Sequence, residues 1–146
     1  MLMIVTTALE RDLAGQLRLG SMRLARRLRL ERGSDDLTLS QLAVLGSLER
    51  QGDATVGELA NLERVKPPSM TRIVNSLAEA GLVARRAHPD DGRLVIISLT
   101  DEARAVLADD RRRRTAWLAQ RLAELTADER DLLRNVAPLL DRLASS

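Results

Sequence analysis

Apolar residues recur every three or four positions through most of the chain, and this spacing places them on one face of an α-helix. The first such stripe predicts a long helix over about residues 7–32, which Gly33 ends. Its apolar positions are Leu9, Leu13, Leu17, Leu24 and Leu28. Because a small core does not need so long a covering helix, the pattern favours a second use as a subunit interface. A helix that packs only internally is the alternative.

Two short helices are predicted next, and each begins with a Thr followed three residues later by Gln or Glu. This is the spacing of a capping box, in which both side chains bond to free backbone amides at the start of a helix. The two pairs are Thr38 with Gln41 and Thr55 with Glu58. Gly52 ends the first helix, and a turn over residues 63–66 leads from the second to a third. The spacing is typical of a helix-turn-helix.

The third helix is predicted from a pair of prolines to a closing glycine. Pro67 and Pro68 suit a first helical turn, where the missing amide protons have no intrahelical partner, and Gly81 suits the position after a helix. One face is apolar and should be buried, at Met70, Ile73, Val74 and Leu77. The outward face is polar and carries Pro68, Ser69, Arg72, Asn75, Ser76 and Glu79, with Thr71 on its flank.

These polar side chains have the chemistry that reads or grips DNA. Arg forms paired hydrogen bonds to guanine, Asn does so to adenine, and Ser or Thr bonds to bases or phosphates. Arg64 and Lys66 lie in the preceding turn, where they are placed to bind phosphate. An ordinary solvated helix face with solvated turn residues is the alternative.

Two strand-like runs follow, over residues 82–87 and 93–99, and the turn-forming residues 88–92 join them. They predict an antiparallel hairpin that packs well on one face and partly on the other. Its charged rim consists of Arg85, Arg86 and Arg93. An Arg at the tip suits the minor groove, and Asp91 is placed to hold its guanidinium by a paired hydrogen bond. A surface salt bridge of little energy is the alternative.

Two more helices are predicted at the end of the chain. Thr100 caps the first, which runs to about Leu125. Its apolar stripe is interrupted by a block of charge at residues 109–114, for which a solvated helix face is favoured over DNA contact. Thr126 and Glu129 have the spacing of a third capping box at the start of the last helix, which Pro138 is expected to kink or divide.

In this order, the motifs resemble those of winged helix-turn-helix regulators of the MarR type (multiple antibiotic resistance regulator). The shared pattern is a recognition helix ending in Gly-Leu-Val, then Arg, then Asp-x-Arg at the wing tip, then Leu-Thr at the start of a long helix. Here these are Gly81-Leu82-Val83, Arg86, Asp91-Gly92-Arg93 and Leu99-Thr100. The similarity extends upstream to residues 37–41 and 58–60. Length and helix order agree over nearly the whole chain.

The periodicity predicts a mainly α fold with a small antiparallel β-hairpin, and the resemblance implies how it is organised. Residues 1–146 are expected to form a single MarR-type domain. Within it, residues 37–100 are the winged helix-turn-helix DNA-binding lobe, and residues 7–33 and 101–146 are a helical dimerisation region. The expected DNA-binding residues are Lys66, Ser69, Thr71, Arg72, Asn75, Ser76, Arg85, Arg86 and Arg93, with Asp91 orienting the wing.

The amino-acid composition limits how the protein can recognise a nucleic acid and which signals it can sense. Hydrophobic residues make up 45% of the 146 residues, which is enough for a core, but Trp117 is the one aromatic residue. Recognition by base stacking is therefore excluded. With 23 basic and 21 acidic residues the net charge is +2, so DNA affinity has to come from local placement of charge. The absence of cysteine excludes disulfides and thiol sensing.

No catalytic or cofactor chemistry is predicted. His88 is the only histidine and lies in a predicted turn, where a stabilising or exposed role is favoured over that of a metal ligand. The sequence has no Gly-rich phosphate loop and no nucleophile elbow, so neither an enzyme nor a bound cofactor is expected. No apolar run approaches the length of a membrane span, so a cytoplasmic protein without a membrane partner is expected.

The predicted function is that of a transcriptional regulator that binds double-stranded DNA sequence-specifically. As the resemblance implies, the regulator is a repressor that binds an inverted-repeat operator as a homodimer, and a small lipophilic effector releases it. The alternative is a helical interaction module whose winged-helix domain docks another protein without binding DNA.

Overall fold

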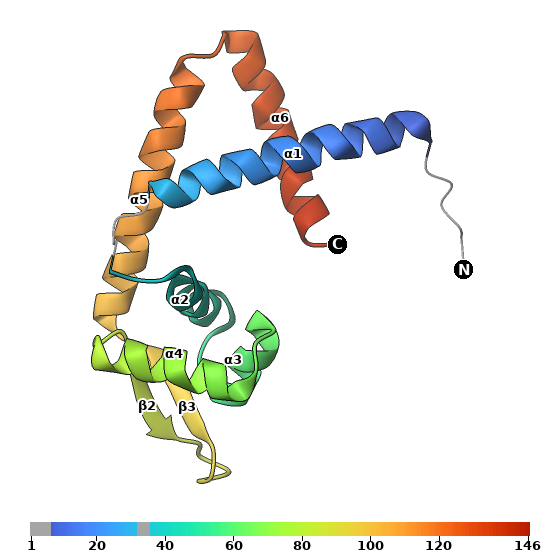
Figure 1. Ribbon diagram of the computed structural model, residues 1–146. Helices are drawn as coiled ribbons and strands as arrows, with labels where there is room; N and C mark the ends of the chain where they lie inside the picture. Colours follow the sequence, from blue (N-terminus) through green and yellow to red (C-terminus); the bar gives the residue numbers. More distant parts are fainter. Residues whose placement is uncertain (1–6, 32–35) are drawn as a thin grey trace. The chain divides into compact units, whose positions relative to one another are not determined.

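The computed structural model describes residues 7–31 and 36–146 (Figure 1). Its helices are α1 (Ala8–Leu30), α2 (Leu39–Gln51), α3 (Val56–Glu63), α4 (Pro67–Glu79), α5 (Asp101–Ala123) and α6 (Ala127–Ala144). Its strands are β1 (Ala54–Thr55), β2 (Val83–Ala87) and β3 (Val95–Leu99). The predicted fold class, mainly α with a small antiparallel sheet, is confirmed. The predicted helix end at Gly33 lies outside the described residues, and α1 ends with Glu31 as its C-cap.

The starts of the helices follow from local capping. The three predicted capping boxes are present at α2, α3 and α6, and a fourth joins Thr7 to Glu10 at the start of α1. Thr100 caps α5, because its hydroxyl accepts a hydrogen bond from the backbone N–H of Ala103 at 3.2 Å. The same hydroxyl donates to the carbonyl of Gly81 at 2.7 Å, which ties the start of α5 to the end of α4.

The sheet contains one strand more than the predicted hairpin. Its order is β1-β3-β2, and β3 pairs antiparallel with both neighbours. Strand β1 pairs only Ala54 with Ile97 and Thr55 with Ile96. Two residues are too few to form an alternating pattern of apolar and polar positions. Thr55 is also the N-cap of α3, and the sequence predicts only this capping role.

Residues 36–112 form one compact unit, termed here the winged unit. Its buried side chains come from α2, α3, α4, the sheet and the first half of α5, where Ala103 and Leu107 join the core. The largest fully buried side chains are Leu45, Leu59, Met70, Leu77 and Ile97. Burying each of these side chains stabilises the fold by about 1.5–3 kcal/mol relative to leaving it exposed. Aliphatic side chains therefore stabilise this core without aromatic residues.

The charge block at residues 109–114 differs from its prediction. Asp110 is only 2% exposed, so the expected solvated face is wrong at this residue. Folding places it on the side of α5 that also carries buried Leu107. The neighbouring Arg111 bonds to Glu49 of α2 at 2.7 Å, and Arg112 bonds to Asp109 at 2.8 Å. Both contacts lie within the protein.

The remaining described residues, 7–31 and 113–146, form a second unit. It contains α1, the second half of α5 and α6. The guanidinium carbons of Arg27 and Arg121 lie 4.8 and 5.5 Å from the centre of the Trp117 ring. Helix α6 continues through Pro138, so the proline does not divide it; the helix forgoes the hydrogen bond that this position cannot donate. Neither α1 nor α6 has a buried residue, and both expose many leucines.

Candidate nucleic-acid interface

Helix α4 separates an apolar inner face from a polar outer face, as predicted. Met70, Val74 and Leu77 are buried and Ile73 packs partly against the same core. Pro67 opens the helix, and Gly81 follows it with a φ of +75°, in the left-handed region that glycine adopts most readily. The burial of one face fixes which side chains α4 turns outward.

Three predicted site residues of this region are exposed and unengaged. The side chains of Lys66, Ser69 and Arg72 form no hydrogen bond or ion pair with any residue that the structure describes. Arg64, in the turn before α4, is equally unengaged within the described part of the chain, and its φ of 53° gives α3 a left-handed C-cap. Their donors therefore remain free for an external acceptor, and the phosphates and base edges of DNA are acceptors of this kind.

Three other predicted residues of α4 are engaged within the protein. The Thr71 hydroxyl donates to the carbonyl of Pro67 at 3.0 Å, a local bond within the helix. The Ser76 hydroxyl accepts a hydrogen bond from the Gln41 amide of α2 at 2.6 Å. The Asn75 side-chain oxygen accepts one from the Arg85 guanidinium of β2. The sequence predicted Gln41 as a capping residue but did not predict its contact with Ser76, because contacts between residues far apart in sequence leave no local pattern.

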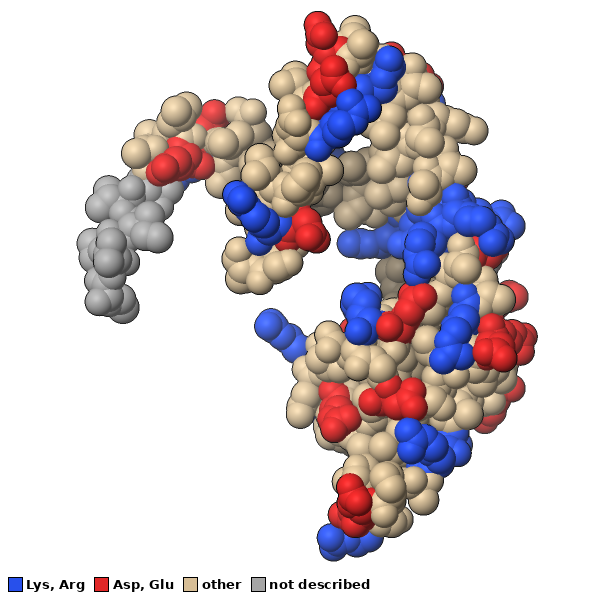
Figure 2. Space-filling model, turned by 180° about the vertical axis from the view of Figure 1, so that it is seen from behind, with Lys and Arg blue, Asp and Glu red and all other residues tan. Residues whose placement is uncertain are grey.

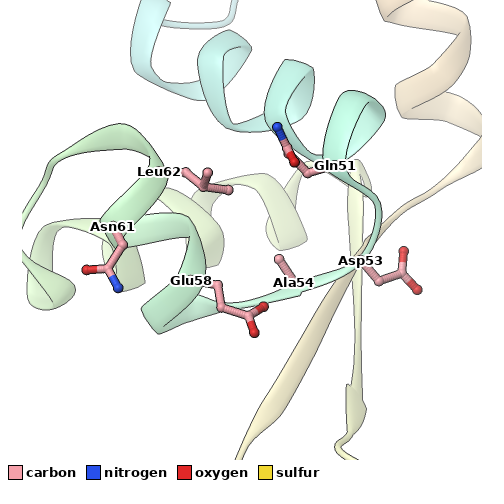
Figure 3. A pocket seen from close by; sticks show the side chains of 6 residues that line it. All are labelled: Gln51, Asp53, Ala54, Glu58, Asn61 and Leu62. Carbon is pink, nitrogen blue, oxygen red and sulfur yellow. The ribbon is translucent and has the colours of Figure 1, made fainter.

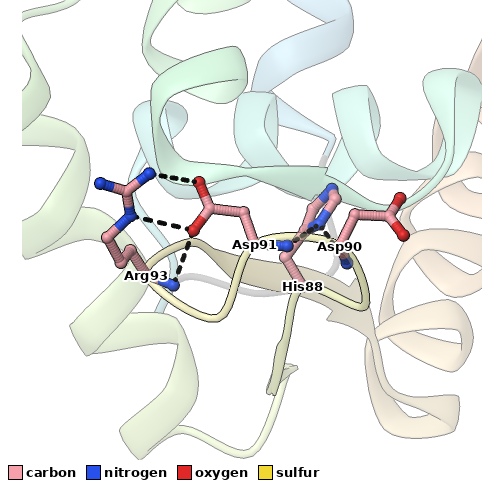
Figure 4. Close-up of polar contacts among 4 residues, drawn as sticks. All are labelled: His88, Asp90, Asp91 and Arg93. Atoms are coloured by element: carbon pink, nitrogen blue, oxygen red, sulfur yellow. Dashed lines mark hydrogen bonds and ion pairs between the residues drawn. The ribbon is translucent and has the colours of Figure 1, made fainter.

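The hairpin turn is organised by His88 (Figure 4). Its Nδ1 atom accepts hydrogen bonds from the backbone N–H groups of Asp90 and Asp91, at 3.1 and 3.2 Å. Its own backbone N–H donates to the carbonyl of Leu94 at 3.0 Å. The stabilising role favoured for this histidine is therefore found, in a tautomer that leaves Nδ1 unprotonated.

Asp91 and Arg93 form a clasp at the wing tip (Figure 4). The Arg93 guanidinium donates through Nε and Nη2 to the two carboxylate oxygens, at 3.1 and 3.3 Å, and the backbone N–H donates at 3.1 Å. The side-chain hydrogen bonds from Arg93, followed by its backbone N–H, hold the pKa of the Asp91 carboxyl below its usual value of 3.8. The Arg93 side chain is still 90% exposed, so the clasp fixes its direction without covering it.

Arg85 and Arg86 of β2 also have partners within the winged unit. Arg85 bonds to Asn75, and Arg86 forms an ion pair with Asp53 at 3.0 Å. The exposed ion pair of Arg86 contributes only about 0–1 kcal/mol, so Asp53 is easily exchanged for phosphate. All three predicted wing arginines are thus held in defined positions by weak contacts.

Basic and acidic groups intermingle on the face drawn in Figure 2, in keeping with the small net charge. The described residues include no group of three or more His, Cys, Asp or Glu side chains placed to hold a metal ion. In the same described part, no helix is long and apolar enough to cross a membrane.

A shallow hollow of about 440 Å³ lies beside β1, lined by Gln51, Asp53, Ala54, Glu58, Asn61 and Leu62 (Figure 3). The Asp53 carboxylate points away from the hollow toward its ion pair with Arg86. The Glu58 carboxylate accepts the backbone N–H of Thr55 at 2.9 Å in the capping box. Both charges are therefore already used, and the hollow offers an outside molecule little beyond two amide side chains.

Comparisons with known proteins agree on one class. Residues 37–95 match the MarR family. An HTH-type transcriptional regulator from Mycobacterium bovis is 48% identical over 128 residues, which cover 88% of this chain and 90% of that protein. The HTH-type transcriptional repressor MdtR of Bacillus subtilis is 36% identical over 93 residues, 64% of this chain and 60% of MdtR. A crystal structure of a Pseudomonas aeruginosa protein is 38% identical with a TM-score of 0.86, covering 97% of this chain and 99% of that one.

Proposed function

The chain belongs to the MarR family of helix-turn-helix transcriptional regulators, and from this premise we propose that it represses transcription by binding an inverted-repeat operator as a homodimer. The observation that carries the proposal is the outward face of α4, where Ser69 and Arg72 are exposed and unengaged by the described residues. A helix of this kind, supported by α2 and α3, fits the major groove of double-stranded DNA.

Each site residue has a proposed task. Arg72 reads a guanine through paired hydrogen bonds, while Ser69 and Thr71 contact bases or phosphates beside it. Asn75 and Ser76 extend the reading face toward the end of α4. Lys66 binds phosphate at the start of the helix, and Arg86 does so after exchanging Asp53 for the backbone of the DNA.

The wing has a separate proposed task. Arg93 inserts into a minor groove, where the narrow groove of A·T-rich sequence concentrates negative potential. Asp91 orients it, since the clasp fixes the guanidinium in a direction that leaves the side chain exposed. A fixed side chain loses less conformational freedom on binding than a mobile one.

Homodimerisation is proposed for the helices outside the winged unit. Residues 7–33 and 101–146 form the dimerisation region in this proposal, with the first half of α5 also packing on the winged core. The exposed leucines of α1 and α6 support it, because this many apolar side chains exposed on two helices are typical of a surface that a partner covers. They include Leu9, Leu13, Leu24, Leu30, Leu132, Leu139, Leu140 and Leu143. Two recognition helices related by a two-fold axis require half-sites about 10 base pairs apart.

Release by a small lipophilic effector is the remaining part of the proposal. A molecule that binds one spacing of the two α4 helices better than another shifts the dimer toward or away from DNA. The absence of cysteine from the sequence leaves no thiol to act as the trigger. Thermal-shift screening of lipophilic metabolites with and without operator DNA tests this part; a ligand that stabilises the free protein and dissociates DNA is expected. A screen in which no stabilising ligand affects binding contradicts effector release and leaves a constitutive repressor.

The salt dependence of DNA binding tests the function as a whole. A protein that neutralises phosphates releases counterions, so its affinity for DNA falls steeply as salt rises. A module that only docks another protein shows no retention on DNA even at low salt. Selection from a random double-stranded library, followed by anisotropy titrations at several salt concentrations, distinguishes the two; enrichment of no sequence and no low-salt binding contradicts the proposal.

A further inference from the structure

A hydrogen bond fixes the orientation of the Asn75 side-chain amide on the recognition helix α4. Its side-chain oxygen accepts a hydrogen bond from the Nη2 group of Arg85, which projects from strand β2. A guanidinium has only donors, so the amide oxygen, and not the amide nitrogen, has to face it. The Asn75 NH₂ group is thereby turned away from Arg85, with both of its protons uncommitted to any described residue.

The element that supplies Arg85 is fixed. Strand β2 pairs with β3 along its whole length, with Arg85 opposite Ile97, and Ile97 is fully buried. Val83, two residues earlier on the same strand, is also buried. A side chain that starts from a paired strand is held more precisely than one from a loop, which is what an orienting residue requires.

Ser76, the next residue of α4, also accepts a hydrogen bond from a side chain outside the helix. Its oxygen accepts from the Gln41 amide nitrogen at 2.6 Å, while the Gln41 amide oxygen accepts from the backbone N–H of Thr38 at 2.7 Å. The hydroxyl proton of Ser76 is left to donate. Two adjacent residues of α4 thus have an acceptor occupied by donors from outside the helix, and each keeps a donor for an external partner.

The orientation of Asn75 bears on which base it reads. A paired contact with adenine needs the Asn oxygen as acceptor for N6 and the Asn nitrogen as donor to N7. Guanine presents two acceptors, N7 and O6, and thymine presents O4. Arg85 uses one of the two lone pairs of the Asn75 oxygen, and a cationic donor on this oxygen weakens it as an acceptor for a second donor such as adenine N6. Asn75 held in this way therefore fits guanine or thymine better than adenine.

We propose that Arg85 is a specificity-determining positioning residue, which holds Asn75 as a hydrogen-bond donor and so disfavours adenine at the base pair that Asn75 reads. This inference rests on the proposed function, because it requires α4 to lie in the major groove. It assigns Arg85 a task different from phosphate binding, which is the task that a basic wing residue would otherwise have.

Arg86 is the matched control for the test. It lies next to Arg85 on the same strand and is also exposed and charged, but it bonds to Asp53 and not to Asn75. Arg85→Ala, Arg86→Ala, Asn75→Ala and the double variant of residues 75 and 85 are titrated on the selected operator. The same variants are titrated on operators carrying each base substitution across one half-site. Arg85→Met, which keeps the aliphatic stem, is a second variant in case Arg85→Ala unfolds.

We expect Arg85→Ala to change base preference at a single position of the operator half-site. The preference for guanine or thymine over adenine should fall there by about fivefold or more, the lower limit for losing one paired contact. Asn75→Ala should flatten preference at the same position, and in the double variant the change at residue 85 should have no further effect on it. Arg86→Ala should weaken all operators alike.

Three outcomes contradict the inference, and they are distinguishable. If Arg85→Ala weakens all sequences equally and lowers the salt slope by about one unit, as Arg86→Ala should, Arg85 is a phosphate contact. If Asn75→Ala alters base preference at no operator position, Asn75 does not read a base. Arg85 then cannot determine base preference through Asn75. In both cases the wild type still binds DNA, so the proposed function stands. A wild type that binds no DNA overturns the proposed function and this inference together.

Discussion

Arg72 lies in the middle of the outward face of α4, and no described residue engages its guanidinium. We expect Arg72→Ala to cost about 1–3 kcal/mol at one operator position and to relax base preference there, because a paired contact with guanine is lost. Anisotropy titrations against operators substituted at each position measure this. Glu79→Ala, on the same exposed face but without a donor, is the control and should not relax preference; equal effects of Arg72→Ala at all positions would contradict the assignment.

The Asp91–Arg93 clasp makes a prediction about pH. The pKa of Asp91 is lowered in the folded protein, so the clasp contributes stability above pH 3.8 and loses it as the pH falls through the lower folded pKa. The clasp should therefore stay intact between about pH 5 and pH 8. The carboxyl carbon of Asp91, followed by NMR, should titrate below 3.8, and in Arg93→Ala its midpoint should rise. An unchanged midpoint in that variant would show that Arg93 does not hold the carboxylate.

For individual residues, the sequence predicted the chemistry of a side chain better than it predicted which residues that side chain contacts. Asp91 and Arg93 are two positions apart, so their bond was predictable from spacing. The partners of Asn75 and Ser76 lie ten and 35 residues away, and only the fold brings Arg85 and Gln41 to them. The burial of Asp110 was missed for the same reason, since a run of charges looks solvated until the packing of its helix is known.

The turn of the wing hairpin depends on His88 as a hydrogen-bond acceptor. We expect His88→Ala to speed amide exchange at Asp90 and Asp91, whose N–H groups lose their partner. Global stability should fall by only about 1 kcal/mol, because the freed amides can bond to water at this surface. Hydrogen exchange measured by NMR checks this. His88→Asn, whose side-chain oxygen can accept in a similar place, should keep exchange slow; equally fast exchange in both variants would contradict the geometric role of Nδ1.

Helix starts were the elements that sequence predicted best. Capping boxes act within four residues, so Thr38, Thr55 and Thr126 determine them locally. Strand β1 was not predicted, because its two residues become a strand only by pairing with β3. A kink or a division of α6 at Pro138 was predicted from propensity, and the helix is not divided there.

For the whole molecule, the exposed leucines of α1 and α6 predict a dimer at micromolar concentration. Leu132→Glu and Leu143→Glu should each weaken the dimer roughly tenfold or more, because a carboxylate placed in an apolar interface lacks a partner. Light scattering over a dilution series measures the dissociation constant. Leu94→Glu is the control, since Leu94 is also exposed but lies in the wing hairpin. A monomeric wild type, or equal weakening by all three variants, would contradict this interface.

One titration tests whether α4 and the wing together bind double-stranded DNA. Wild type, Arg72→Ala and Arg93→Ala are measured on one selected inverted-repeat operator and on scrambled DNA, at two salt concentrations. The wild type should prefer the operator and weaken steeply with salt. Arg72→Ala should lose much of the preference, whereas Arg93→Ala should lose affinity for both DNAs and about one unit of salt slope. Unchanged affinity in both variants would contradict DNA binding by α4 and the wing.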